Sequence, residues 1–362
     1  MRQKLTELCD ILYGFAFDSA GFTEDSTYPP LVRIRDVKRG YSETNYSGDY
    51  QEQYVIHAGD LLIGMDGEFN IARWKSRDAL LNQRVCKISA KEGTEEEYLR
   101  FALSRALREI ENRTAFVTVK HLSAKELNKL ELQVPSLSEQ NRIAITLRRI
   151  EQLIDLRNEE LKKLDELIRA RFVEMFNNRN YPKVKLGSVC KKITDGTHKT
   201  PNYLDEGVTF ISAKNIVNGE LDFSDIKHIS EREYQEIQKR CQTEIGDILL
   251  SKSGSLGAPV IVKTEEKLGL FESLAVLKYE RDRFLPEFLC EQLKTDAIQR
   301  QFSTGTKGVA VKHLHLGVIA NTEIIEPPIE EQRAFTSFVK QVDKSKCDAS
   351  NITSATQYQL AS

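Results

Sequence analysis

The chain repeats much of its own sequence, and this internal repeat constrains its fold more than any other feature. The tetrapeptide VKHL stands at residues 119–122 and again at 311–314, and five further pairs of blocks recur around it in the same order. The offset between the two copies drifts from about 180 to 192 residues, as insertions in loops would make it. The other pairs are KLTELCDILYGFAF with KLGSVCKKITDGTH, LVRIRDVKRG with FISAKNIVNG, HAGDLLIGMDGEFN with EIGDILLSKSGSLG, RVCKI (84–88) with AVLKY (275–279), and VPSLSEQNRIA with PPIEEQRAF.

A repeat of this length makes each copy a domain, because the stacked units of solenoid proteins have periods of only about 20–50 residues. Within each copy, β-type segments and glycine turns precede a helical stretch, VKHL and a last strand. The sequence therefore predicts an α+β fold with a pseudo-two-fold axis: two globular α/β domains separated by two long helices that form an antiparallel coiled coil. The expected domains are 1–137 and 181–329, and the expected helices are 138–180 and 330–362.

Residues 138–176 contain neither proline nor glycine and are expected to form one long helix, with Ser138 as its N-cap. Apolar residues step by four and three, as in a coiled-coil seam, and eight basic and eight acidic residues indicate a solvated surface. A helix of about 37 residues spans roughly 55 Å, enough for a spacer between domains; helices buried inside one compact domain are the alternative. The seam residues are Ile143, Leu147, Ile150, Ile154, Leu161, Leu164 and Ile168, then Phe335, Phe338 and Val342 in a second, shorter helix.

The overall composition argues against several classes of protein. The net charge of −2 does not indicate a protein that coats nucleic acid by bulk charge, although it leaves local basic surfaces open. No run approaches the roughly 18 apolar residues of a membrane span, and the N-terminus lacks the apolar core of an export signal. The six cysteines form no CxxC pair, so we expect buried, reduced thiols in a cytoplasmic protein rather than disulfides or a zinc site.

Catalytic signatures are missing from the sequence. STGTKGVAV (303–311) contains Gly and Lys in the wrong order for a phosphate-binding Walker A loop, and no G-x-G-x-x-G opens a helix. The Pro-Pro pairs lack the Asn/Asp/Ser-Pro-Pro-aromatic form of amino-methyltransferases, and the histidines lack metal-ligand spacing. Asp60 and Asp247 recur in paired GD turns, where capping of the turn is the expected role. The chain is therefore predicted not to be an enzyme and to hold no metal.

The ordered pattern resembles the specificity (S) subunit of type I restriction-modification systems over essentially the whole chain. The similarity rests on the paired openings KLTELC and KLGSVC, the turns GDLLIG and GDILLS, the VKHL segments, and P-x-L-x-E-Q-x-R (135–142) before a long helix. The resemblance implies two target recognition domains, each reading one half of a bipartite double-stranded DNA target. It implies helices that set the half-site spacing and dock two methyltransferase subunits. It also implies no cofactor in this chain, with S-adenosylmethionine and ATP bound by the methyltransferase and restriction subunits.

Two other functions stay open from the sequence. A recognition subunit of a type II-like or orphan methyltransferase or nuclease system would have the same architecture with different partners. A protein-interaction scaffold that binds no DNA would belong to another class. Loss of a bipartite N6-methyladenine motif on removal of the chain would separate the type I reading from the scaffold.

Positions where the copies share a framework but differ in side chain are the expected DNA-reading surface. MDGEFN (65–70) and KSGSLG (252–257) differ after shared GD strands, as do LVRIRDVKRG and FISAKNIVNG. Arg, Lys, Asn and acidic side chains can read base edges in the major groove; ordinary solvated loop residues are the alternative. The candidates are Arg33, Arg35, Asp36, Asp66, Glu68 and Asn70 in copy one, and Lys214, Asn215, Lys252, Ser253 and Ser255 in copy two.

Residues that both copies keep unchanged should contact something common to both half-sites. VKHL is such a segment, so we expect it to contact the DNA backbone or to form a framework corner between a strand and a helix. The loops before it, NRTAFVT and STGTKGVA, are also candidates for backbone contact. These backbone or framework residues are Lys120, His121, Lys307, Lys312 and His313.

Overall fold

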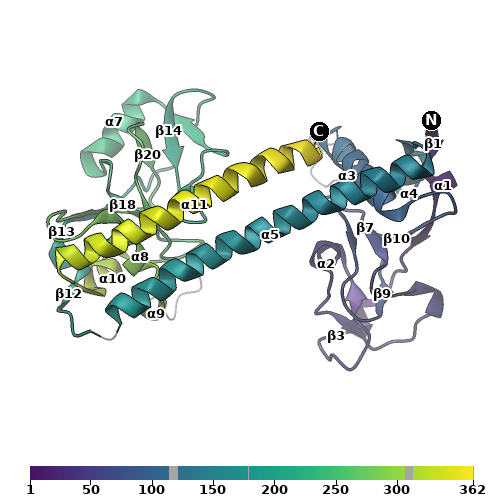
Figure 1. Cartoon of the computed structure of the whole chain (residues 1–362), viewed down its shortest axis with the longest axis horizontal. Helices are drawn as coiled ribbons and strands as arrows, with labels where there is room; N and C mark the ends of the chain where they lie inside the picture. Colours follow the sequence, from purple (N-terminus) through teal and green to yellow (C-terminus); the bar gives the residue numbers. More distant parts are fainter. Residues whose placement is uncertain (114–120, 178, 306–312, 362) are drawn as a thin grey trace. The chain divides into compact units, whose positions relative to one another are not determined.

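The computed structural model describes residues 1–113, 121–177, 179–305 and 313–361 (Figure 1). The chain divides into two compact units, Met1–Leu156 with Thr353–Ser362 and Arg157–Ile352. The long helix α5 (Leu137–Phe176) belongs to both units, because the division falls inside it. Each unit contains one copy of the sequence repeat.

Each unit is built around a four-stranded antiparallel sheet with the same connectivity. The strand order is β2-β10-β7-β8 in the first unit and β13-β21-β18-β19 in the second. Strands β7 and β18 follow the Gly-Asp pairs at 59–60 and 246–247, and we call them the GD strands. Both are inner strands, and all four residues of each are buried. The strands are β2 (Cys9–Tyr13), β10 (Val85–Ala90), β7 (Leu61–Gly64), β8 (Ile71–Arg73), β13 (Cys190–Asp195), β21 (Leu274–Tyr279), β18 (Ile248–Ser251) and β19 (Pro259–Ile261).

The register of these sheets corrects one block of the predicted alignment. If RVCKI faced AVLKY, Arg84 would align with Ala275. The sheet pairs Ile88 with Leu61 and Leu277 with Ile248, so Ile88 aligns with Leu277 and Arg84 with Ser273, a shift of two residues. A shift of two keeps every side chain on the same face of the strand, so the hydrophobic pattern could not reveal the error.

A smaller sheet in each unit contains one parallel pair of strands. Its order is β4-β9-β6 in the first unit and β17-β14-β20 in the second, with β4 parallel to β9 and β14 parallel to β20. The third strand differs: β6 pairs with β9, whereas β17 pairs with β14. The strands are β4 (Leu31–Val32), β9 (Ala79–Leu81), β6 (Val55–Ile56), β17 (Lys227–Ile229), β14 (Val208–Ile211) and β20 (Leu268–Leu270).

Short strand pairs complete both copies. The first strand of each copy pairs with the strand before the long helix, β1 with β11 and β12 with β22. The turn between β15 and β16 contains Asn218 and Gly219, both with positive φ, as a tight hairpin turn requires. The strands are β1 (Arg2–Lys4), β11 (Glu131–Gln133), β12 (Lys183–Lys185), β22 (Glu323–Ile325), β3 (Phe22–Thr23), β5 (Asn45–Tyr46), β15 (Ile216–Val217) and β16 (Glu220–Leu221).

Helices close the cores of both units. In the first unit α3 (Glu96–Arg113) buries Leu99, Leu103 and Leu107 at the spacing of one helix face. In the second unit two shorter helices, α8 (Pro286–Leu293) and α9 (Asp296–Thr304), contribute to the core. The remaining helices are α1 (Leu5–Leu8), α2 (Ile34–Arg39), α4 (Ala124–Lys129), α6 (Leu186–Val189), α7 (Glu231–Arg240) and α10 (Leu316–Asn321), with 3₁₀ turns η1 (Ser19–Gly21), η2 (Glu52–Tyr54) and η3 (Ala213–Asn215).

The long helices α5 and α11 (Ile329–Ala361) begin in the same way, on a buried glutamine. Gln140 and Gln332 are 1% and 0% exposed, although each is a polar residue. In both, the side-chain amide donates to a proline carbonyl just before the helix and accepts a backbone N–H of the domain. This gives the repeated E-Q pair of the motif a structural meaning. The distances are 3.1 Å to Pro135 O and 2.9 Å from Glu95 N for Gln140, and 2.9 Å to Pro327 O and 3.0 Å from Leu285 N for Gln332.

The N-cap of α5 is Ser136, and the prediction of Ser138 was wrong. The backbone N–H of Glu139 donates to Ser136 Oγ at 3.3 Å, and that of Gln140 donates to Ser136 O at 2.9 Å. Ser136 stands three residues before Glu139, which is the spacing of a capping box. Ser138 lies inside the first turn, where its side chain cannot reach these donors in the same way.

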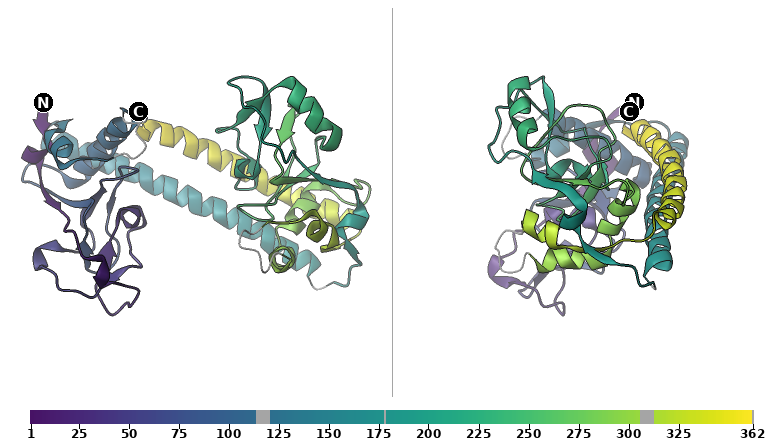
Figure 2. Two further views of the ribbon diagram at one scale, coloured as in Figure 1. Left: turned by 180° about the vertical axis from the view of Figure 1, so that it is seen from behind. Right: turned by 90° about the vertical axis from the view of Figure 1, so that its left-hand side faces the viewer.

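In the second unit α5 and α11 lie side by side and run antiparallel (Figures 1 and 2). Phe172, late in α5, packs on Phe335, early in α11, with ring centroids 5.5 Å apart. Asp165, earlier in α5, pairs with Lys346, later in α11, at 2.7 Å. The predicted antiparallel arrangement of the helices is therefore confirmed within this unit.

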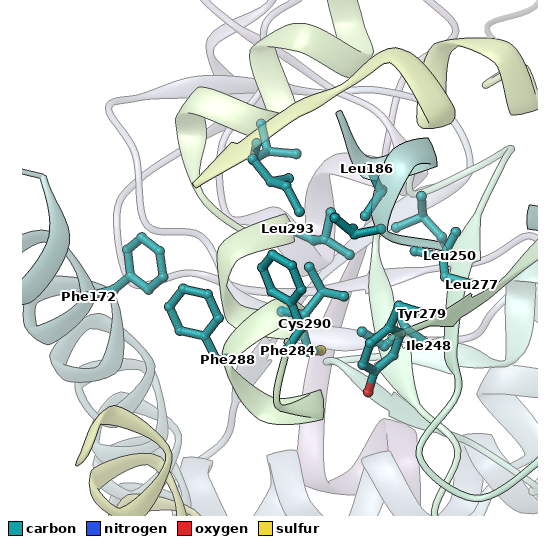
Figure 3. Packing of buried hydrophobic residues seen from close by; sticks show 14 of the residues in the cluster. Phe172, Leu186, Ile248, Leu250, Leu277, Tyr279, Phe284, Phe288, Cys290 and Leu293 are labelled. Atoms are coloured by element: carbon teal, nitrogen blue, oxygen red, sulfur yellow. The ribbon is translucent and has the colours of Figure 1, made fainter. Parts of the chain in front are cut away.

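The helix pair is joined to the core of the second unit through aromatic side chains. Phe172 stacks on Phe288 of α8 (Figure 3). The two ring centroids are 5.7 Å apart. Of the predicted seam residues, Ile168, Phe335 and Val342 are buried in this core, and Leu164 and Phe338 pack against it. The others are half-buried: Ile143, Leu147, Ile150, Ile154 and Leu161.

Candidate nucleic-acid interface

The described end of the VKHL segment, His121–Leu122 in copy one and His313–Leu314 in copy two, docks in the same way in both copies. Its leucine donates its backbone N–H to the residue that follows the GD strand, and that residue donates its own N–H to the start of the neighbouring strand segment. We call this arrangement the VKHL corner. Because only backbone atoms make it, the side chains around it are free to differ between copies. The bonds are Leu122 N to Met65 O at 2.7 Å and Met65 N to Arg84 O at 2.8 Å in copy one, and Leu314 N to Lys252 O at 2.8 Å and Lys252 N to Ser273 O at 2.7 Å in copy two.

Turns on both sides of the GD strand are also shared. Gly67 and Gly254, in the turn after the strand, have φ of 72° and 70°, a region that side chains rarely adopt. In the turn before it, Asp60 accepts the backbone N–H of His57 at 2.8 Å, and Asp247 accepts that of Glu244 at 2.9 Å. The two aspartates cap the turns, as the sequence predicts.

In copy one, α2 and the turn after β7 approach one another. Lys38 Nζ, in the last turn of α2, lies 3.6 Å from Glu68 Oε2 in the turn. Asn70 donates its side-chain N–H to the Glu68 carbonyl at 3.1 Å. The result is a surface of mixed charge. Of the predicted reading residues, Arg33, Arg35 and Glu68 are exposed, and Asp66 and Asn70 are half-buried.

Asp36 and Asn215 have a structural role and do not belong to an exposed reading surface. They are only 1% and 3% exposed. Asp36 Oδ2 accepts the backbone N–H of Arg33 at 3.0 Å, and Asn215 Oδ1 accepts that of Ser212 at 3.0 Å. Both side chains therefore close the start of a short helix. The prediction failed here because Asp and Asn are preferred for helix capping as well as for base reading.

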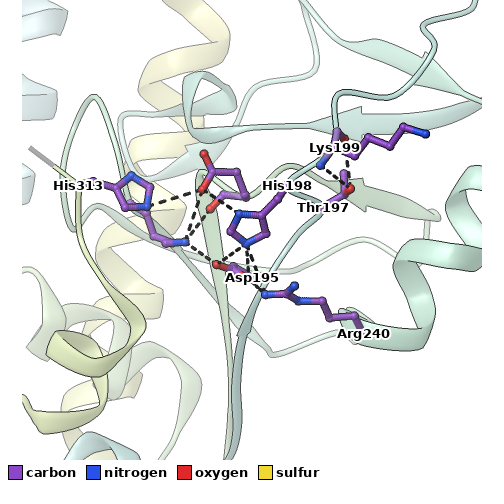
Figure 4. A network of polar contacts seen from close by, with 8 residues as sticks. Asp195, Thr197, His198, Lys199, Arg240 and His313 are labelled. Atoms are coloured by element: carbon purple, nitrogen blue, oxygen red, sulfur yellow. Dashed lines mark hydrogen bonds and ion pairs between the residues drawn. The ribbon is translucent and has the colours of Figure 1, made fainter. Parts of the chain in front are cut away.

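Lys252 is also withdrawn from the reading surface, because its ammonium group is buried in a network of ion pairs with Asp195 and Glu272. Figure 4 shows Asp195, His198 and Arg240 of this network. Lys252 is 3% exposed, lies 2.5 Å from Asp195 Oδ2 and donates to the Glu272 carbonyl at 2.9 Å. Burial alone would raise the pKa of the Asp195 carboxyl, but Lys252, Arg240 and His198 lower it below its usual value. The carboxylate is thus ionised and balances the buried ammonium.

The other predicted residues of copy two lie nearer to solvent. Lys214 pairs with Asp225 at 2.8 Å; the lysine side chain is half-exposed and the aspartate side chain is largely exposed. Ser255 is exposed in the glycine turn, and Ser253 is half-buried beside it. This surface carries fewer charges than its counterpart in copy one.

The shared histidines occupy equivalent places but have different partners. His121 Nδ1 contacts Asp66 Oδ1, and its side chain is 45% exposed. His313 Nε2 lies 3.7 Å from Glu272 Oε2. Burial, and then the Lys252 ammonium, lowers the pKa of His313. The predicted backbone-contact residues Lys120, Lys307 and Lys312 lie outside the residues that the structure describes.

A comparison with known families decides what kind of protein carries these corners. The family described as "Type I restriction modification DNA specificity domain" matches residues 1–166 and 178–355. The chain belongs to this family. It is therefore a DNA specificity subunit of a type I restriction-modification system and a non-catalytic component, as the sequence predicts.

Individual relatives agree with this assignment. The chain is 29% identical over 374 residues to the type I restriction enzyme EcoBI specificity subunit of Escherichia coli, covering 94% of this chain and 79% of that protein. It is 19% identical over 349 residues to the MjaVIII specificity subunit of Methanocaldococcus jannaschii, covering 87% and 82%. Its fold is similar to a structure reported for complex assembly and conformational transition of the type I R-M system, with a TM-score of 0.51, 19% identity, and 99% and 94% coverage.

Three charged residues of this specificity subunit were missed by the sequence prediction: Arg84, Asp195 and Arg240. Arg84 adopts a φ of 72°, unusual for a residue with a side chain, and contacts Asp66 and His121. The sequence does contain a signal for Arg84, because the equivalent residue in copy two is Ser273. Only the correct register aligns these two residues. Asp195 and Arg240 carry no such signal, because the contact joins residues 45 positions apart in a loop-rich region.

Among the described residues, no three His, Cys, Asp or Glu side chains are arranged to hold a metal ion. In the same part of the chain, no helix combines the length and the apolar character needed to cross a membrane. Five cysteines form no disulfide, and burial raises their thiol pKa to about 11 in Cys9 and to about 12 in the others, so they stay protonated. The others are Cys86, Cys190, Cys241 and Cys290.

Proposed function

We propose that each copy reads one half of a bipartite DNA target with the side chains around its VKHL corner. The observation that carries this proposal is the contrast at the corner. The backbone bonds are the same in both copies to within 0.1 Å, while Met65, Asp66 and Arg84 are replaced by Lys252, Ser253 and Ser273. A fixed frame with variable side chains is what two readers of different sequences need.

The proposed base-reading side chains are those of the predicted set that are exposed or half-buried. Arginine and lysine donate to guanine O6 and N7, asparagine pairs with adenine, and acidic groups accept from cytosine N4. These residues are Arg33, Arg35, Asp66, Glu68 and Asn70 in copy one, and Lys214, Ser253 and Ser255 in copy two. For the DNA backbone we propose Lys120, His121, Lys307, Lys312 and His313, because both domains meet phosphates whatever the base sequence.

We further propose that two methyltransferase subunits dock on the long helices and that restriction subunits join the full complex. Helix α5 exposes large apolar side chains along its length, and a subunit that docks on the helix would bury them. These subunits would bring S-adenosylmethionine and ATP, and this chain would bind neither. The proposed place of action is the cytoplasm, where free thiols persist. The exposed side chains are Ile145, Leu153, Leu156, Leu167 and Val173.

Methylome sequencing of cells with and without this chain tests the proposal. We expect the chain, expressed with its methyltransferase subunits, to produce one bipartite N6-methyladenine motif that is lost on deletion. Replacement of residues 1–137 by the recognition domain of another specificity subunit should change one half of the motif and leave the other intact. An unchanged methylome after deletion would refute the proposed function.

A further inference from the structure

Each copy holds one half-exposed arginine beside its VKHL corner, tethered by a carboxylate at one nitrogen. In copy one, Arg84 Nη1 lies 3.4 Å from Asp66 Oδ1 and 3.0 Å from His121 Nδ1. The arginine side chain is 49% exposed, and that of Asp66 is 23% exposed. Among the described residues, all these contacts are made through Nη1, so the rest of the guanidinium fork is directed elsewhere.

In copy two, Arg240 at the end of α7 has the same kind of tether (Figure 4). Its Nη2 contacts Asp195 Oδ1 and lies 3.4 Å from His198 Nε2. The arginine side chain is 55% exposed, whereas that of Asp195 is only 4% exposed. Asp195 is fixed in turn by Lys252, the residue of the VKHL corner itself. One terminal nitrogen is again held by the protein while half of the side chain faces solvent.

The two arginines are not equivalent in sequence. The position of Arg84 is Ser273 in copy two, where the hydroxyl is buried and accepts the backbone N–H of Ala213 at 3.0 Å. Arg240 stands on α7, a helix of ten residues between β17 and β18, whereas copy one has only the 3₁₀ turn η2 between β5 and β6. An arginine held by a carboxylate therefore occurs in both copies, at positions that are not equivalent in sequence.

Stability alone does not account for these tethers. An ion pair with a half-exposed arginine contributes little to folding, because water screens it and the side chain loses entropy. Arg84 also keeps a left-handed backbone, which costs free energy and is found mostly where the surroundings impose it at functional sites. A tether instead lowers the entropy lost when the remaining N–H donors bind a planar acceptor pair.

We propose that Arg84 and Arg240 are specificity-determining residues, each donating to O6 and N7 of a guanine in the major groove, one in each half-site. Guanine presents two acceptors on this edge, and the guanidinium fork matches them in the plane. This proposal rests on the proposed function, because it assigns one base to each recognition domain. Asp195 is a positioning residue in this scheme, and Asp66 positions Arg84 in addition to its proposed place on the reading surface.

The test combines a change in one protein side chain with a change in one DNA atom. The full chain is purified with its methyltransferase subunits and bound to duplexes that carry its methylated motif. Each guanine of the motif is replaced in turn by 7-deazaguanine, which lacks the N7 acceptor. We expect one guanine per half-site at which the replacement weakens wild-type binding. Because one of two acceptors is lost, the effect should reach at most the roughly 5- to 150-fold of a complete bidentate pair.

Arg84→Ala should remove this sensitivity in one half-site only, and Arg240→Ala in the other. Arg84→Lys and Arg240→Lys keep the charge but lose the fork, so they should also lose the sensitivity while retaining affinity for unrelated DNA. If thermal melting shows that an alanine variant does not fold, the corresponding lysine variant takes its place in the test. Matched controls are Arg105→Ala on α3 and Arg232→Ala on α7, both exposed arginines that should leave the pattern unchanged.

The two proposals fail in different ways. If the wild-type complex produces no bipartite motif, the proposed function is refuted. If it produces one, but the arginine variants keep the full sensitivity to 7-deazaguanine or a half-site contains no guanine, only the present inference is overturned. Loss of sensitivity in the same half-site for both arginines would overturn it as well.

Discussion

Asp195 and Lys252 form an ion pair inside the second unit, and their side chains are 4% and 3% exposed. Removing one member of a buried pair costs about 3–5 kcal/mol, because the other charge loses its compensation, while neutral replacement of both can cost little. Asp195→Asn should therefore lower the free energy of unfolding by about 3 kcal/mol. Adding Lys252→Met should recover most of the loss, since copy one carries Met65 there. Urea unfolding of the chain measures both; equal loss in the single and double variants would contradict the pairing.

Acid should weaken the same region through two groups. The pKa of Asp195 lies below its ordinary 3.8, so its contribution is present above that value and is lost as the pH falls through the folded-state pKa. The pKa of His313 lies below its ordinary 6.5, so the folded state favours the neutral ring and loses stability as the pH falls. Urea midpoints between pH 7 and pH 3 should decrease steadily. His313→Gln should make the urea midpoint less dependent on pH at the upper end of this pH range. The same pH dependence in the variant and the wild type would exclude a contribution from His313.

The long helices depend on the buried glutamines at their N-termini. Gln332→Leu removes an acceptor for the Leu285 N–H and a donor for the Pro327 carbonyl, both in the interior. A buried polar group left without a partner costs about 1–3 kcal/mol, so we expect a loss in that range or slightly above it. Gln341→Leu, exposed on the same helix, is the matched control and should cost less than about 0.5 kcal/mol. Equal losses for the two variants in urea unfolding would show that the glutamine contacts are not important.

The same helices show what the sequence could predict and where it could not. The duplication could be predicted because the repeated blocks stand in the sequence itself. The long helix after Pro135 could be predicted because the residues that follow contain neither proline nor glycine. The choice of Ser136 over Ser138 as N-cap had a signal in the sequence that the prediction did not use, because Ser136 and Glu139 have the spacing of a capping box. Asp36, Asn215 and Lys252 were misplaced because residue type does not distinguish a helix cap or a buried ion from a base reader. The Asp195–Arg240 contact was missed because it depends on tertiary structure.

Considered over its full length, the chain uses one backbone frame twice and changes the side chains that surround it. The frame includes the VKHL corner, the capped GD turn and the glutamine at the start of each long helix. These features are the same in both copies, whatever side chains surround them. Under the proposed function, sequence choice and half-site spacing are therefore separate properties: the first belongs to each corner, the second to the helices.

This separation predicts the effect of lengthening the helices. Four residues inserted into α5 after Leu156, with four into α11 after Ile352, add about 6 Å and turn the helix by about 40°. One base pair adds about 3.4 Å and turns the duplex by about 35°. The rotations match, and the added length exceeds the rise of one base pair but falls short of two, so the methylated motif should keep both half-sites and gain one unspecified base pair between them. Two residues add about 3 Å but turn the helix by about 200°, so this control should abolish methylation. Methylome sequencing reads both outcomes, and an unchanged spacing after the four-residue insertion would show that the helices do not set it.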